Sequence, residues 1–221
     1  MGRTQLIAAL VLIVAAAGLI AGRVALNDDD AATEAALAGG AETPGAEADA
    51  EAEETTTTTT EPIPEPERLG PAEEFAGLDG WLQTDADSLA DFDGQVRIVQ
   101  FWTFACHNCT ATIPHLQGIY ERHQADGLEI IGVHTPEFDF ERDPDAVAAA
   151  AVDLGVTWPI ALDPNKVSFR QWQPGRRFWP RTFVVDQEGE VRYNHIGEGR
   201  YDELEETVAY LIENGPGSTG A

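Results

Sequence analysis

VRIVQFWTFACHNCTATIP, residues 96–114, is the stretch of sequence that decides the fold. Its first seven residues are mostly apolar, which is typical of a buried strand. Cys106 and Cys109, the only two cysteines of the chain, follow with C-x-x-C spacing. Apolar residues then recur at helical spacing from Ile113 to Tyr120. The pattern predicts that the cysteine pair lies where a central strand ends and a helix begins.

This junction indicates redox chemistry for the two thiols. The first N–H groups of a helix have no partner within the helix, and the helix dipole favours negative charge at this end. A cysteine in such a place generally has a lowered pKa and holds its thiolate more easily. A second thiol one turn later can attack the mixed disulfide that forms first. The motif therefore predicts thiol–disulfide exchange.

Three alternatives to redox chemistry stay open for the cysteine pair. A structural disulfide with this spacing closes a very small loop and removes little entropy from the unfolded chain. A zinc site needs four ligands, and although His107, His115 and His123 are near in sequence, no second pair of ligands has the usual spacing. Two ordinary buried cysteines fit poorly with the abrupt change from strand to helix. We therefore expect no metal at this site.

The charge of the chain excludes one class of partner. The formal net charge is −26, and residues 27–74 hold fifteen acidic side chains against the single base Arg68. A charge of this sign and size repels nucleic acid and anionic membrane surfaces. We expect no nucleic-acid partner.

The N-terminal residues 1–26 predict a membrane anchor. They include seventeen consecutive uncharged residues, 6–22, which span most of a bilayer core. This run exceeds the usual apolar part of a signal peptide, and no clear cleavage site follows it. Arg3 before it and the acidic residues 28–30 after it place the N-terminus in the cytoplasm. We expect a single-pass protein of the cell membrane with its folded domain on the extracytoplasmic side; a cleaved signal peptide is the alternative and exports the same domain.

The rest of the chain divides into three parts. Residues 27–74 are expected to be a disordered acidic tether rich in Thr and Pro, and residues 215–221 a disordered tail. Residues 75–214 carry the folded domain. In it, we expect a short leading strand and turn at 81–82 and 89–92, and helices from the cysteine pair to about 126, at 143–155 and at 201–212. The further strands are expected at 96–102, 128–133, 159–162, 181–185 and 190–196. This alternation predicts an α/β fold with a mixed central sheet and helices on both faces.

The order of these elements resembles the thioredoxin fold. It is similar to the extracytoplasmic TlpA/ResA-type thiol–disulfide oxidoreductases and, more specifically, to the carboxy-terminal thioredoxin-like domain of DipZ-type proteins. The segments that carry the resemblance are FWTFACHNC (101–109), IPH (113–115), LEIIGVHTPEF (128–138), LGVTWPIALD (154–163), FWPRTFVVD (178–186) and GEGRYDE (197–203). The resemblance covers about residues 95–212 and leaves out the anchor and the tether.

The resemblance implies roles for particular residues. Cys106 is expected to be the exposed attacking thiol and Cys109 the resolving thiol. Pro180 is expected to be a cis-proline opposite the pair. The residues expected to bind the substrate are Trp102, His107, Asn108, Trp179 and Pro180. No cofactor is expected beyond a redox-active disulfide between Cys106 and Cys109.

Two positions depart from the relatives. Gln100 stands where thioredoxins have a buried carboxylate, and Thr112 stands where ResA-like proteins have a glutamate. The proton acceptor for Cys109 is therefore not visible in the sequence, and Asp85, Asp87, Glu137 and water are the candidates.

We expect a reductase of protein or peptide disulfides, fed by a membrane electron carrier of the CcdA/DsbD type and serving cytochrome c maturation. Three alternatives remain: a disulfide-forming oxidant, a thiol peroxidase of the peroxiredoxin type, and a non-catalytic interaction module. Thr103, three residues before Cys106, matches the peroxiredoxin pattern, but the C-x-x-C spacing does not.

Overall fold

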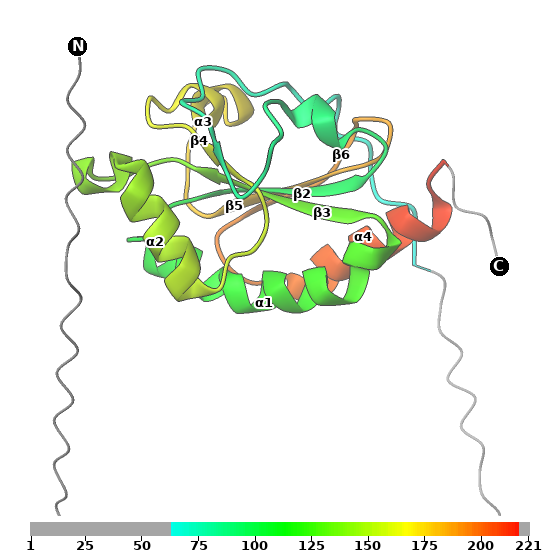
Figure 1. Ribbon diagram of the computed structural model, residues 1–221. Helices are drawn as coiled ribbons and strands as arrows, with labels where there is room; N and C mark the ends of the chain where they lie inside the picture. The colour runs from blue at the N-terminus through cyan, green and yellow to red at the C-terminus, as the bar shows by residue number, and fades with distance from the viewer. Residues whose placement is uncertain (1–62, 217–221) are drawn as a thin grey trace, which may run out of the picture. The chain divides into compact units, whose positions relative to one another are not determined.

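The computed structural model describes residues 63–216 (Figure 1). The predicted anchor at 1–26, most of the predicted tether and residues 217–221 lie outside this part of the chain. Among the residues that the structure describes, no helix is long and apolar enough to cross a bilayer.

Six strands form one mixed sheet in the order β1-β4-β3-β2-β5-β6. β2 pairs in parallel with β3 and antiparallel with β5, and all seven of its residues are buried because it is central and covered on both faces. The predicted central strand is confirmed. The strands are β1 (Trp81–Leu82), β2 (Val96–Trp102), β3 (Leu128–His134), β4 (Ile160–Leu162), β5 (Arg181–Val185) and β6 (Val191–Ile196).

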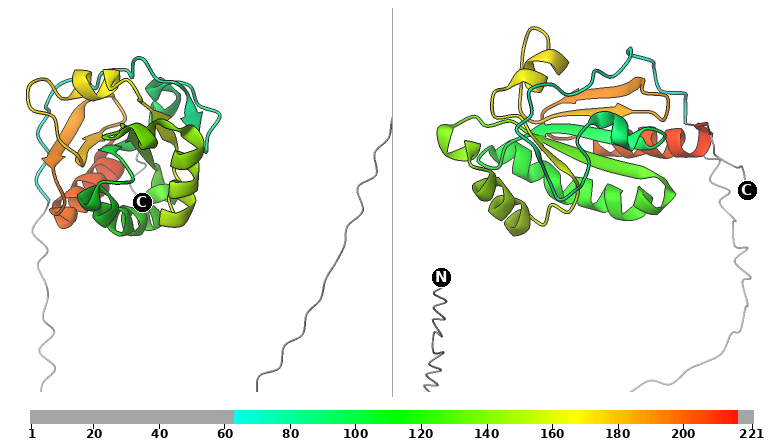
Figure 2. Two further views of the ribbon diagram at one scale, coloured as in Figure 1. Left: turned by 90° about the vertical axis from the view of Figure 1, so that its left-hand side faces the viewer. Right: turned by 45° about the horizontal axis from the view of Figure 1, so that its top comes forward.

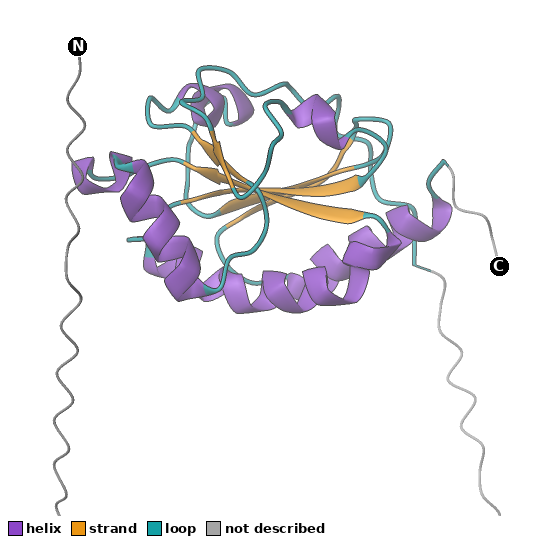
Figure 3. Ribbon diagram, viewed as in Figure 1, coloured by secondary structure: helices purple, strands orange, loops and turns teal. Residues whose placement is uncertain are grey.

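Helices cover both faces of this sheet, as predicted (Figures 1 and 3). Helices α1 (His107–His123), α2 (Pro144–Leu154) and α4 (Tyr201–Asn214) pack on one face, and the short helix α3 (Val167–Trp172) packs on the other. The two turned views show α4 beside α1 (Figure 2). Successive residues of β2 point to opposite faces of the sheet, so Ile98 joins the core under α1, α2 and α4, and Val99 joins the core under α3. The mixed α/β sandwich is the thioredoxin-like arrangement that the sequence predicts.

One helix differs from expectation. α3 was not predicted, because its six residues are too few for a helical period to show; its N-terminus is fixed by the Asp163 carboxylate, which accepts hydrogen bonds from the N–H groups of Val167 and Phe169. α1 continues through Pro114, in agreement with the single helix predicted from the cysteine pair to about residue 126, and the last three residues of that span form a 3-10 helix.

The segment before residue 75 already belongs to the folded domain. The N–H of Leu69 donates to the carbonyl of Val191 at 2.8 Å, and the N–H of Ala72 donates to that of Gly189 at the same distance. The segment thus runs along the outer strand β6. The expected tether boundary at residue 74 is therefore too late, because backbone pairing with a strand some 120 residues further on leaves no local sequence signal.

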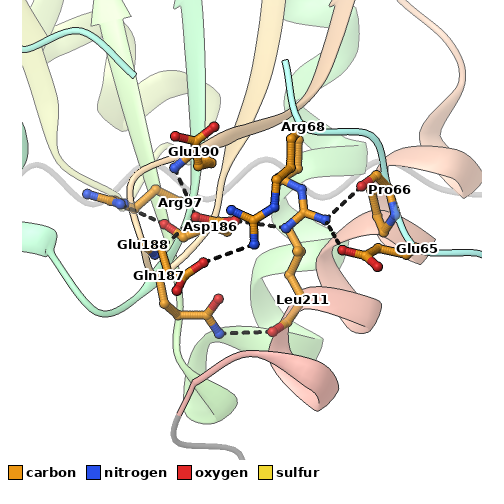
Figure 4. Close-up of polar contacts among 10 residues, drawn as sticks. Glu65, Pro66, Arg68, Arg97, Asp186, Gln187, Glu188, Glu190 and Leu211 are labelled. Atoms are coloured by element: carbon orange, nitrogen blue, oxygen red, sulfur yellow. Dashed lines mark hydrogen bonds and ion pairs between the residues drawn. The ribbon is translucent and has the colours of Figure 1, made fainter. Parts of the chain in front are cut away.

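An ionic network centred on the buried Arg192 and Asp186 holds this segment in place (Figure 4). The Arg192 guanidinium donates to the carboxylate of Asp186 at 2.8 Å, to that of Glu65 at 3.0 Å and to the carbonyl of Pro66 at 2.7 Å. Arg97 donates to the Asp186 carbonyl at 2.7 Å. Hydrogen bonds from Arg192 and from backbone N–H groups outweigh the effect of burial and keep the pKa of Asp186 below its usual value. The network joins the segment at 65–66 to the centre of the sheet.

Candidate active site

Cys106 and Cys109 lie at the start of α1, directly after β2. Cys106 is the N-cap residue and is partly exposed, whereas Cys109 in the first turn is fully buried. Both are free thiols, and the N–H of Cys109 donates to the Cys106 sulfur at 3.3 Å. This contact satisfies one of the unpaired N–H groups of the helix and favours negative charge on the acceptor. One sulfur therefore faces the solvent, and the other lies behind it.

The buried sulfur is held in its protonated form. Burial raises the pKa of Cys109 far above its ordinary value, and the neighbouring Cys106 and the charge of Glu141 raise it further. Since the thiolate is the nucleophile in disulfide exchange, Cys109 is unreactive while the pair is reduced. The difference in burial thus separates an attacking from a resolving sulfur.

A neutral pair occupies the two positions where relatives carry acids. The amide of Gln100 donates to the Thr112 hydroxyl at 2.6 Å, and this hydroxyl donates to the carbonyl of Cys109 at 2.7 Å. Both side chains are buried. The acidic candidates Asp85, Asp87 and Glu137 are all exposed. No carboxylate therefore replaces the missing acid at these two positions.

Glu141 is a buried carboxylate that the sequence did not single out. Its oxygens accept hydrogen bonds from the Thr103 hydroxyl and from the N–H groups of Ala105 at 3.0 Å and of Glu137 and Phe138, both at 2.8 Å. Burial raises the pKa of Glu141, but these hydrogen bonds outweigh burial and the pKa lies below its usual value. Glu141 is thus an ionised group tied to the loop that carries Cys106.

The residues around Glu141 carry little signal of this role, because an acid in the polar turn EFDFE is expected on the surface. A glutamate on this turn becomes visible only when the turn is seen to fold back on the loop after β2. Glu141 is the functional candidate that sequence reasoning missed.

His134 at the end of β3 is buried between aromatic rings. It stacks on Phe104 with ring centroids 5.5 Å apart and meets the edge of Trp102 at 5.4 Å. Its Nε2 lies 3.3 Å from the Thr103 hydroxyl. Burial lowers the pKa of His134 to about 4, so the ring is neutral at neutral pH. These contacts give His134 a packing role at the end of β3.

The Trp179–Pro180 peptide bond is cis, which confirms this prediction. The register that pairs Phe101 with Arg181 brings Pro180 to the end of β2, where the cysteine loop begins. The Trp179 ring stacks on Phe169 with centroids 4.4 Å apart, and its Nε1 donates to the carbonyl of Thr135 at 3.0 Å. The loop before β5 is thereby held at the end of the sheet where the cysteine loop begins.

The remaining predicted substrate-binding residues divide into two kinds. His107 and Asn108 are exposed on the first turn of α1. Trp102 is only 1% exposed, so the expectation that it borders the substrate is wrong. It packs over Gly132, where a Cβ atom would come within 2.7 Å of the indole nitrogen. An apolar residue ending a central strand faces the core when that face is covered by helices.

Comparisons with known proteins agree with this geometry. The AhpC/TSA family model matches residues 71–194. Protein DipZ of Mycobacterium bovis is 39% identical over 151 residues, which are 67% of this chain and 21% of the relative. The thiol-disulfide oxidoreductase YkuV of Bacillus subtilis is 24% identical over 64% of this chain and 94% of the relative. The resemblance expected from the sequence is confirmed, and the chain spans about a fifth of the DipZ relatives.

A solved structure described as a thiol-disulfide isomerase from Corynebacterium glutamicum superposes with a TM-score of 0.57 at 20% identity. The match covers 66% of this chain and 98% of that one. At this identity the similarity concerns the fold alone. It supports the thioredoxin-like architecture around the two sulfurs.

Proposed function

Since the chain belongs to the AhpC/TSA family, we propose that it is a thioredoxin-type thiol–disulfide oxidoreductase that reduces protein disulfides outside the cytoplasm. The observation that carries this proposal is the unequal placement of the two sulfurs. Cys106 caps α1 and is accessible, whereas Cys109 lies buried behind it within one helical turn. This is the geometry that a two-step exchange requires.

The reaction begins with the thiolate of Cys106, which attacks one sulfur of a substrate disulfide. A mixed disulfide forms, and the other substrate sulfur leaves and takes up a proton. Cys109 then loses its proton and attacks the Cys106 sulfur, which releases the second substrate thiol. The substrate gains two electrons and two protons, and the chain ends with a Cys106–Cys109 disulfide. Thiol–disulfide exchange always passes through such mixed disulfides.

Burial of Cys109 gives this sequence of steps its order. In the reduced pair, the raised pKa of Cys109 leaves Cys106 as the only sulfur able to attack. After the mixed disulfide forms, the Cys109 thiol lies beside the bond that it must break. A segment of the substrate bound beside Cys106 would contact His107 and Asn108 on α1 and the backbone before Pro180.

The membrane setting is part of the proposal. The uncharged run at 6–22 would anchor the chain in the cell membrane, and the acidic, Thr- and Pro-rich segment after it would act as a tether. Exported compartments are generally oxidising, so a reductase there needs electrons from a membrane carrier of the CcdA/DsbD type. Proteins of cytochrome c maturation are the substrates that the family resemblance suggests.

A trapping experiment tests the exchange. The full chain with Cys109→Ala should retain its substrate on Cys106 as a stable mixed disulfide, and additional Cys106→Ser should abolish the adduct. Absence of any adduct in the first variant contradicts the proposed function.

The reduction potential of the pair decides the direction of electron flow. A value near that of thioredoxin, about −270 mV, supports a reductase, whereas a value near about −120 mV indicates an oxidant. Equilibration with glutathione, followed by mass spectrometry, measures it.

A thiol peroxidase is the less favoured function. The Thr103 hydroxyl, which matches the peroxiredoxin pattern in the sequence, donates to the carboxylate of Glu141. It is thereby engaged away from Cys106. Consumption of peroxide by the reduced chain, at rates above those with disulfides, would favour the peroxidase instead.

A further inference from the structure

The turn between β3 and α2 has its side chains reversed relative to a normal surface turn. This turn contains a short 3-10 helix, Asp139–Arg142, which Phe138 directly precedes. Phe138 and Phe140 are 51% and 59% exposed, whereas Glu141 is fully buried. Burying a carboxylate is costly unless hydrogen bonds satisfy it, and large apolar side chains normally lie inside. Four donors hold Glu141 in place. The turn is therefore anchored in a form that presents two phenylalanine rings to the outside.

These rings are continuous with the cysteine loop. Phe138 and Phe140 stack nearly parallel with centroids 5.7 Å apart, and Phe140 contacts Phe104 at 5.9 Å. Phe104 lies two residues before Cys106 and is itself partly exposed. We call Phe104, Phe138 and Phe140 the aromatic ridge. The aromatic ridge therefore reaches the loop that carries Cys106 through Phe104.

The surroundings of the aromatic ridge are acidic. Residues 137–145, EFDFERDPD, hold five acidic side chains and one basic residue, and four of the acids are exposed. Arg142 is engaged by Asp139 at 3.3 Å and by the carbonyl of Pro164 at 2.6 Å. A partner that covers the phenylalanine rings also meets this negative charge, which attracts basic side chains.

We propose that the aromatic ridge is a docking surface for an apolar, basic-flanked segment of a protein substrate beside its disulfide. The proposal rests on the disulfide exchange proposed for Cys106 and adds the class of substrate that it selects. An apolar segment removes the two exposed rings from water, and lysine or arginine beside it pairs with the exposed carboxylates. Exposed apolar side chains rimmed by polar groups are typical of interaction surfaces.

A set of matched disulfides tests this selection. The reduced full chain is given a disulfide peptide with apolar residues and flanking lysines, the same peptide with glutamates for lysines, the same peptide with serines for the apolar residues, and hydroxyethyl disulfide. The second-order rate constant for the first peptide should exceed those for the other two peptides at least tenfold. In the double variant Phe138→Ser, Phe140→Ser, the ratio of the rate with this peptide to that with hydroxyethyl disulfide should fall at least tenfold.

Val152→Ser is the matched control, because Val152 on α2 is another exposed apolar side chain, 78% exposed. It should leave the ratio unchanged. A double variant that keeps the wild-type ratio overturns the docking proposal, as does equal reduction of the three peptides by the unaltered chain. Self-association or binding to neutral lipid vesicles that needs Phe138 and Phe140, without peptide selection, also overturns it. Failure to reduce even hydroxyethyl disulfide instead contradicts the proposed exchange at Cys106.

Discussion

Replacing Glu141 by glutamine should destabilise the reduced chain by about 2 kcal/mol at pH 7. Each carboxylate oxygen of Glu141 accepts two hydrogen bonds. An amide replaces one of these oxygens by an NH₂ group, so at least one backbone N–H of the turn or of the cysteine loop loses its acceptor. A hydrogen bond to a charged group is worth about 1.5–3 kcal/mol, and removal of a buried charge offsets part of this loss.

The destabilisation by Glu141→Gln should depend on pH in a defined direction. The pKa of Glu141 in the folded chain lies below its usual value. The contribution of the ionised Glu141 to the free energy of unfolding is therefore fully present above the pKa of a glutamate in the unfolded chain, about 4.3. This contribution is lost as the pH falls through the lower pKa of Glu141 in the folded chain. The stability difference between the unaltered chain and the variant should be largest at neutral pH and should shrink at acidic pH.

Urea unfolding under reducing conditions, followed by tryptophan fluorescence at several pH values, measures both effects. Glu137→Gln is the control, because Glu137 is an exposed acid of the same turn and surface substitutions usually change stability by less than about 0.5 kcal/mol. An effect of Glu141→Gln that is as small as the control, or equally large at neutral and acidic pH, refutes the assignment of an ionised, hydrogen-bonded carboxylate.

Three further predictions concern buried polar groups. Thr112→Val removes the acceptor of the buried Gln100 amide and should cost about 1–3 kcal/mol in urea unfolding; an unchanged midpoint would show that this hydrogen bond does not support the helix. Asp186→Asn removes the charge that pairs with the buried Arg192 and should lower the free energy of unfolding by about 3–5 kcal/mol. Proteolysis at residues 65–72 should become faster, and an unchanged rate would show that the network does not hold that segment. Because burial lowers the pKa of His134 to about 4, the unfolded chain alone takes up a proton below about pH 6.5, and stability should fall by about 3 kcal/mol between about pH 6.5 and 4. This part of the slope should be absent in His134→Gln, and equal slopes would contradict a neutral buried ring.

The sequence predicts those features of the fold that depend on local patterns. A strand that is buried on both faces has a nearly continuous apolar sequence, whereas a helix that is buried on one face has apolar residues at helical spacing. These two patterns, at 96–102 and after it, locate β2, α1 and the cysteine pair. Trp179 and Pro180 are found through a resemblance to known proteins, since no local pattern separates a cis from a trans proline. The thioredoxin-like sheet follows from the order of these elements.

The features that escape prediction depend on contacts between distant segments. Glu141 is expected to be a surface acid until its turn is placed against Thr103 and Ala105. Trp102 is expected at the rim of the site because it stands just before the cysteine loop, and nothing local shows that Gly132 of β3 leaves room for its indole in the core. The pairing of Leu69 with β6 likewise requires the folded edge of the sheet.

The most direct test of the central claim is a count of thiols and disulfides in one reaction. The reduced full chain is mixed with an equimolar disulfide peptide, quenched by alkylation and mapped by mass spectrometry. We expect one peptide disulfide to be lost for each Cys106–Cys109 disulfide that forms, with the Cys106 mixed disulfide as the intermediate. Two results would contradict exchange through Cys106: loss of the peptide disulfide while both cysteines remain alkylated thiols, or a mixed disulfide that is carried on Cys109.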